Sequence, residues 1–123
     1  MKNDFPVVDI RPSEPLQDYF GDGLGNRWNV ARLIDATKNE PVFLIPLAGM
    51  DLSACIWRDS DFMLLAHHVK AVNDADLSKP IIIAWDGSIA DGRHRIIKAL
   101  TLGHKTIKAV RMTWRPTPCR EAV

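Results

Sequence analysis

The stretch that decides the fold runs from Pro80 to Met112 and reads PIIIAWDGSIADGRHRIIKALTLGHKTIKAVRM. Runs of β-branched residues favour strands, an Asp-Gly pair favours a tight turn, and a Leu-Gly pair is typical of a helix end. The stretch therefore predicts two strands joined by a turn, then a helix, then a last strand. The predicted segments are strand Ile81–Trp85, turn Asp86–Gly87, strand Ser88–Ala90, helix Arg93–Leu102 stopped by Gly103, and strand Thr106–Thr113.

The centre of this stretch, Asp91-Gly92-Arg93-His94-Arg95, has the residue types of a phosphate site. Gly92 allows close approach to the backbone, and the first turn of a helix has unpaired N–H groups that favour an anion. Arg93, His94 and Arg95 add cationic or switchable donors to that turn. Asp91 could cap the helix, orient His94 or Arg95, or help to hold a metal ion. In the structural alternative, Asp91 only caps the helix and both arginines are solvated.

The chain before this stretch predicts two helices and one strand. The spacing of apolar residues predicts a helix over Arg27–Lys38, capped by Asn26, and a second helix over Asp61–Asn73, capped by Ser60 or Asp59. A short apolar run predicts a buried strand over Val42–Leu47. The apolar stripe expected on the second helix consists of Phe62, Leu65, Ala66, Val69 and Val72.

The ends of the chain are rich in proline and glycine. Met1–Asn26 is therefore expected to form an irregular arm, with room for one short strand at Val7–Ile10, and the tail after Trp114 is expected to be loose. The predicted fold class is a small α/β (mixed α+β) domain with a mixed sheet and an N-terminal helical extension. We expect an N-terminal arm and helix over residues 1–40, the domain over 41–114 and the tail over 115–123.

The composition is that of one ordinary globular domain. The chain has 123 residues, of which 46% are hydrophobic and 25% charged, so disordered and coiled-coil classes are excluded. No apolar run approaches the ~20 residues of a membrane helix, and no signal peptide is visible, so a cytoplasmic location without membrane contact is expected. Cys55 and Cys119 are far apart and suit reduced structural thiols.

The net charge of +1 is distributed unevenly along the chain. Residues 1–92 have 8 basic and 14 acidic side chains, a balance of −6, whereas residues 93–123 have 8 basic and 1 acidic, a balance of +7. This asymmetry predicts a cationic surface on the C-terminal quarter. The surface could be a solvated helix and tail beside an acidic body, or a site for phosphate or nucleic acid.

From Val42 to Met112 the chain resembles the ParB/sulfiredoxin superfamily, the fold of the ParB N-terminal domain, sulfiredoxin and the ADP-dependent free-serine kinases. FLIPLAGMDLS resembles the first strand and loop of that fold, PIIIAW its next strand, and LGHKTIKAVRM its closing strand. Asp91-Gly92-Arg93-His94-Arg95 falls on the phosphate-binding box, which is G-E-R-R in ParB proteins, G-C-H-R in sulfiredoxins and D-G-H-H-R in the serine kinases.

The resemblance implies a nucleotide or phosphate bound at this box, with Mg²⁺ near Asp91. We expect Asp91 and His94 to be the candidate catalytic residues. We expect the ligand contacts to come from Gly92, Arg93, His94, Arg95 and His68. Two departures from the family pattern argue against the specific activities of sulfiredoxins and ParB proteins. Arg93 replaces both the sulfiredoxin cysteine and the ParB glutamate, and no room remains after Met112 for the DNA-reading helices of ParB proteins.

Two further positions have alternative roles. His67 and His68 are adjacent on the predicted helix and point ~100° apart, so only one of them could face the box, and both could equally lie on a polar helix edge. Trp57 lies in the loop that borders the pocket in this family, where it could stack on a ligand, close over it or simply pack.

These observations leave three functional hypotheses. The first is a nucleotide- or phosphate-binding domain, with NTP hydrolysis or phosphoryl transfer as its reaction if it is an enzyme. The second is a DNA-binding or nuclease-type protein of plasmid or phage character, favoured by the basic C-terminal quarter. The third is a non-catalytic module whose partner is a protein or a second copy of the chain.

Overall fold

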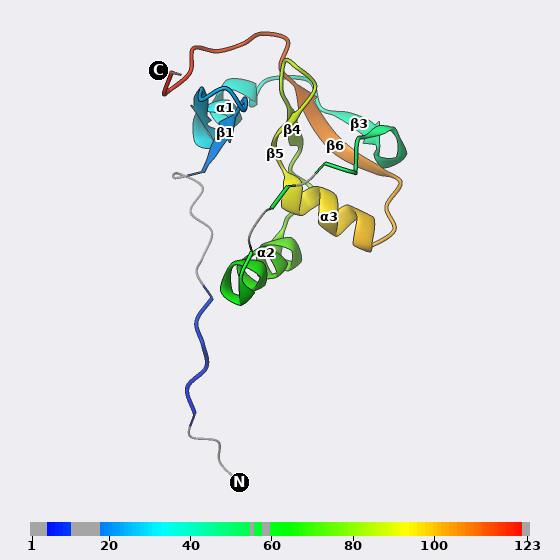
Figure 1. The fold of residues 1–123 in the computed structure, drawn as a ribbon. Coiled ribbons are helices and arrows are strands. Elements are labelled where there is room, and N and C mark those ends of the chain that lie inside the picture. The colour runs from blue at the N-terminus through cyan, green and yellow to red at the C-terminus, as the bar shows by residue number, and fades with distance from the viewer. Residues whose placement is uncertain (1–4, 11–17, 55, 58–59, 122–123) are drawn as a thin grey trace.

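The computed structural model describes residues 5–10, 18–54, 56–57 and 60–121. It contains both helices and sheets, which confirms the predicted α/β class (Figure 1). The larger sheet has the strand order β3 (Phe43–Pro46), β6 (Thr106–Arg111), β4 (Ile81–Ile83), β5 (Ile89–Asp91). It is mixed as predicted, because β4 and β6 are parallel whereas β3 and β5 run antiparallel to their neighbours.

Helix α3 (Arg93–Thr101) connects β5 to β6 and covers one face of this sheet (Figure 1). The apolar cluster beneath it joins the helix, strands β4 and β6 and the short 3-10 turn η2 (Leu47–Gly49). Its buried members are Leu47, Ile81, Ile83, Ile96, Ala99, Ile107 and Ala109. The helix ends as predicted before Gly103, whose φ of 75° lets the N–H of His104 reach the carbonyl of Ala99 at 2.9 Å.

The other face of the sheet is covered by a hairpin of β1 (Tyr19–Gly21) and β2 (Arg27–Asn29) with helix α1 (Val30–Thr37). The centre of this second cluster is Trp28, which is only 1% exposed and packs against the rings of Phe20 and Trp85. Its buried members are Phe20, Trp28, Leu33, Ile82, Ala84, Ala90, Val110 and Met112. The segment from Tyr19 to Thr37 is therefore part of the sheet's hydrophobic core.

This hairpin corrects two predictions. Met1–Asn26 was expected to be an irregular arm, yet Tyr19–Gly21 is a strand, because burial of Phe20 and Trp28 stabilises a ladder too short to be evident in the sequence. Helix α1 starts at Val30 rather than Arg27, since Arg27–Asn29 pairs with β1 and the side chain of Asn29, not Asn26, caps the helix by accepting from Arg32 N. The expected strand at Val7–Ile10 does not form, and that segment joins no ladder among the described residues.

The tail after Trp114 was expected to be loose, and its described part is held against β2 instead. The indole Nε1 of Trp28 donates to the carbonyl of Pro116 at 2.9 Å. Arg27 N donates to the carbonyl of Arg120 at 2.8 Å, and Cys119 N donates to the carbonyl of Arg27 at 2.8 Å. The proline-rich tail forms no helix within the described residues. It is held in place because the buried indole of Trp28 needs an acceptor for its N–H, and the carbonyl of Pro116 supplies it.

Strand β3 forms at the predicted place, but the prediction that it is buried was wrong. Phe43 and Leu44 are exposed, whereas Leu47 just beyond the strand is buried. Among the described strands, β3 lies at the edge of the sheet and pairs with β6 alone. Its side chains are therefore not covered on both faces of the sheet.

Helix α2 (Phe62–Asp74) also forms where predicted, and its cap is Asp61, whose side chain accepts from Leu64 N at 2.8 Å. The suggested cap Ser60 lies one residue too early, and Asp59 lies outside the described residues. No residue of α2 is buried, and the expected core stripe is largely exposed. The reason is that α2 packs on α3 rather than on the sheet (Figure 1), with His68 in contact with His94.

Gly92 joins β5 to α3 in a conformation that only glycine fits. Its φ is +116°, and a Cβ built on it would lie 2.4 Å from Cγ2 of Ile81. Gly87 in the β4–β5 turn also has a positive φ, +86°, but a Cβ there would meet nothing within 4 Å. A side chain at Gly87 would therefore introduce backbone strain alone, whereas a side chain at Gly92 would introduce both strain and steric overlap.

We expect Gly92→Ala to lower the free energy of unfolding by about 3 kcal/mol, because strain and overlap with a core strand act together. Gly87→Ala should cost about 1 kcal/mol from strain alone. Urea unfolding of both variants beside the parent measures the difference. Equal losses for the two variants would contradict the close packing of Gly92 on Ile81.

Candidate functional site

A cleft of about 540 Å³ opens where β1, α1, α2 and the start of α3 meet. All six residues that the sequence singled out line it: Asp91, Gly92, Arg93, His94, Arg95 and His68. Five of them run from the last residue of β5 into the first turn of α3, and His68 comes from the middle of α2. The structure therefore brings the predicted set together in one place.

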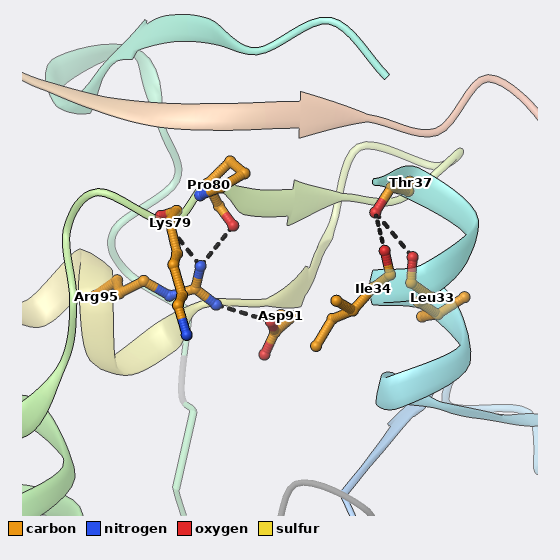
Figure 2. Close-up of polar contacts among 7 residues, drawn as sticks. All are labelled: Leu33, Ile34, Thr37, Lys79, Pro80, Asp91 and Arg95. Carbon is orange, nitrogen blue, oxygen red and sulfur yellow. Dashed lines mark hydrogen bonds and ion pairs between the residues drawn. The ribbon is translucent and has the colours of Figure 1, made fainter. Parts of the chain in front are cut away.

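Arg95, one of the lining residues, makes polar contacts with three other residues (Figure 2). Its Nη2 donates to Oδ2 of Asp91 at 2.7 Å, and its Nη1 donates to the carbonyl oxygens of Lys79, at 3.2 Å, and Pro80. The Arg95 and Asp91 side chains are only 15% and 19% exposed. Arg95 thus joins the start of β4, the end of β5 and α3, and Asp91 orients Arg95. Asp91 does not cap the helix, because the N-cap position is Gly92.

His68 and His94 form a direct pair across the cleft, with Nδ1 of His68 2.9 Å from Nε2 of His94. One imidazole must donate and the other accept, so the pair excludes two protonated rings. Burial lowers the pKa of His68, helped by the charge of His67. Burial also lowers the pKa of His94, helped by His68 and His67. The lowered pKa values favour the neutral form of both rings near pH 7.

Trp57 closes one side of this pair. Its ring stacks on His68 with a centroid distance of 3.8 Å and an interplanar angle of 13°, and it lies 5.5 Å from the His94 ring. Of the roles considered for Trp57, the structure shows packing, here against a histidine of the same chain; stacking on a ligand and closure over it remain predictions. The stack holds His68 in the orientation that meets His94.

Arg93 is an exposed cation of the cleft. It occupies the first position of α3 and forms no salt bridge with the part of the chain that the structure describes. Asp18, just before β1, faces the same place, and burial raises the pKa of its carboxyl, with the nearby Asp91 charge adding to the shift and Arg93 opposing it. Sequence reasoning missed Asp18 and also Lys79, because neither lies in a motif and only the folded chain brings them to the cleft.

A magnesium ion near Asp91 remains a prediction. Among the described residues, no three His, Cys, Asp or Glu side chains are grouped so that they could hold a metal ion. Asp91, the expected ligand, already binds the Arg95 guanidinium. Of the loose acidic set in the loop before α2, Asp51 accepts from Ser53 and Asp61 caps α2, while Asp59 lies outside the described residues.

Cys119 lies away from the cleft, beside a second cavity of about 420 Å³ next to α1. Its Sγ accepts from Asn29 N at 3.3 Å and from Arg32 Nη1 at 2.9 Å, and these bonds lower the pKa of the thiol. Cys55 lies outside the described residues. No helix in the described ranges is long and apolar enough to cross a membrane.

Comparisons of this chain with protein-family models, curated proteins and solved structures gave no match.

We expect Arg95→Ala to lower the free energy of unfolding by about 2 kcal/mol, since it leaves two carbonyls and a partly buried carboxylate without their donor. Arg93→Ala, a change of the same type on the exposed side of the same helix turn, should alter stability by less than about 0.5 kcal/mol. Urea titrations report both values. A loss no larger for Arg95→Ala than for Arg93→Ala would show that the Arg95 contacts do not stabilise the fold.

Acid should destabilise the protein through the histidine pair. Because the pKa values of His68 and His94 are lowered in the folded state, their contribution is complete above the unfolded value near 6.5 and is lost as pH falls through the folded values. The lowered pKa values of aspartates such as Asp51 and Asp76 act only below about pH 4, outside this window.

Unfolding free energies at about pH 7.5 and 5.5 test this expectation. His94→Gln should flatten the decline, whereas His104→Gln, at an exposed site after α3, should keep it. An unchanged slope in His94→Gln would assign the pH dependence to other groups.

Proposed function

We propose that this chain is a phosphate-binding domain whose ligand is a nucleotide or a related phosphate compound held at the start of α3. The observation that carries the proposal is the neutral His68–His94 pair, which lies in one cleft with Arg93 and the first turn of α3. The unpaired N–H groups and dipole of a helix start favour an anion, and Arg93 adds a guanidinium that forms no salt bridge with the described residues. The resemblance of Asp91–Arg95 to the ParB/sulfiredoxin phosphate box supports the same ligand.

Each residue has a defined part in this proposal. Arg93 contacts the phosphate, Gly92 sets the backbone conformation that starts α3, and Arg95 keeps the turn in place through Asp91. His68 and His94 take up a proton as the anion binds, because the added negative charge raises pKa values that burial had lowered. The Trp57 ring already stacks on one flat partner and suits a base.

Binding, rather than hydrolysis or phosphoryl transfer, is the function that this geometry favours. Asp91 and His94 were the expected catalytic residues, but the Asp91 carboxylate is engaged by Arg95 and His94 is engaged by His68.

DNA binding is the second candidate. Lys105, Lys108 and Arg111, on and beside β6, are exposed and form no salt bridge within the described ranges. Such cations would bind a phosphate backbone with a strong salt dependence. They lie outside the cleft, so the two functions are separable by variants.

The test is a thermal-shift and calorimetric panel of pyrophosphate, ATP, ADP, CTP and GTP, with and without Mg²⁺, together with a short DNA duplex. A ligand at about 100 times its Kd should add ~2.7 kcal/mol of stability. Arg93→Ala should weaken nucleotide or pyrophosphate binding by about tenfold or more, with the fold intact. Binding should tighten from about pH 8 to pH 6 as the histidines gain a proton.

Arg111→Ala is the matched control, because it removes an exposed arginine outside the cleft. It should leave nucleotide binding unchanged and weaken any DNA binding. Binding of pyrophosphate would show that the phosphate groups are sufficient for recognition. Binding of a nucleotide but not of pyrophosphate would show that the site also needs the base. No response to any nucleotide or to pyrophosphate, or an equal loss in Arg93→Ala and Arg111→Ala, would rule out the cleft as a phosphate site.

A further inference from the structure

Residues 7–10 have the sequence of a strand but no partner strand within the described ranges. Their sequence, Val-Val-Asp-Ile, favours a strand, yet these residues join no ladder with the part of the chain that the structure describes. Val7 is 89% exposed and Val8 is 72% exposed. Figure 1 shows this blue segment extending away from both sheets. We call residues 7–10 the arm segment.

Strand β3 has the complementary feature, an open sheet edge. It pairs with β6 on one side, and among the described strands none lies on its other side. Leu47 N donates to the carbonyl of Lys105 at 3.0 Å, so the odd-numbered residues of β3 form the hydrogen bonds to β6. The N–H and C=O of Leu44 therefore point to the open edge. Such an edge is a template for a further strand.

We propose that the arm segment of a second copy of this chain adds to the edge of β3 as an antiparallel strand. With Val8 opposite Leu44, these two residues exchange both backbone hydrogen bonds. Main-chain bonds of this kind are how an extended segment adds to an open sheet. Exchange of arms in both directions closes the pair with two-fold symmetry.

The prolines of the two segments agree with this register. Pro6 then lies opposite Pro46, so neither chain has an N–H at the point where the new ladder ends. Pro46 also leaves the β6 ladder intact, because it occupies an even-numbered position whose N–H would point outward. The prolines thus limit the added strand to residues 7–10, which form the arm segment.

The side chains agree with the same register. Residues directly opposite each other in an antiparallel pair share a face of the sheet, so Val8 faces Leu44, which is 62% exposed. Asp9 lies on the other face, opposite Phe43, and Arg111 is an exposed cation of β6 on that face. The chain contains both an open edge and a segment that fits it in backbone phase, apolar contact and charge. These matches favour a second copy as the occupant.

Sedimentation of the full chain over about a hundredfold range of concentration tests the proposal. We expect a monomer–dimer equilibrium whose Kd rises at least about tenfold in Val8→Pro, because proline removes the N–H that donates to Leu44. Val7→Pro is the matched control. The N–H of Val7 points away from β3 in this register, so the Kd should stay within about threefold of the parent value. Both substitutions lie in an exposed segment and should leave the fold intact.

A disulfide distinguishes a second copy from the same chain as the source of the arm. With Cys55 and Cys119 replaced by serine, Val8→Cys combined with Leu44→Cys should give a covalent dimer on mild oxidation. The reason is that opposite residues of such a pair have Cα atoms about 5.5 Å apart. Val7→Cys combined with Leu44→Cys should not, because the two side chains lie on opposite faces of the sheet.

Four results would overturn the proposal. They are a chain that stays monomeric at every concentration, a dimer that survives Val8→Pro, equal losses in Val8→Pro and Val7→Pro, and a disulfide that forms within one chain. The last result would show that the arm segment adds to β3 of its own chain.

Discussion

The contact between the turn at Gly92 and the start of β4 determines the rest of the arrangement. Gly92 packs on Ile81 without a side chain, and Arg95 bonds the carbonyls before β4 while holding Asp91. These contacts fix where α3 begins and in which direction it leaves the sheet. Since α2 rests on α3 and not on the sheet, its His68 meets His94 only because α3 is fixed there. Stability of the core and geometry of the cleft thus depend on the same few atoms.

Both faces of the central sheet are covered, and the two layers have different chemistry. The α3 side is aliphatic, whereas the side of the β1–β2 hairpin is built around the rings of Phe20, Trp28 and Trp85. The aromatic layer also supplies one wall of the cleft, because Asp18, Tyr19 and Phe20 line it. A segment whose sequence is irregular therefore contributes to both the core and the candidate site.

Local signals in the sequence predicted the elements between Pro80 and Met112, because a turn at Asp86–Gly87 and a helix stop at Gly103 need no distant partner. Periodicity also predicted that α2 is a helix, but it identifies an apolar stripe without saying what covers it, so the stripe was assigned to the core in error. The strands of the β1–β2 hairpin have three residues each and depend on burial of Trp28, which no local pattern reports. In the candidate site, the turn residues were predictable, whereas the partner of each histidine depends on how α2 and α3 cross.

The bonds between β2 and the tail have a consequence for how the chain acquires its structure. The backbone of Arg27 is paired with that of Arg120, and the indole of Trp28 with the carbonyl of Pro116, so partners are separated by some ninety positions. Contacts that close such long loops form late and slowly. During synthesis, the hairpin that anchors the aromatic layer would emerge long before its last hydrogen-bond partners, leaving the rim of Trp28 open to solvent or to chaperones until the region around Pro116 has left the ribosome.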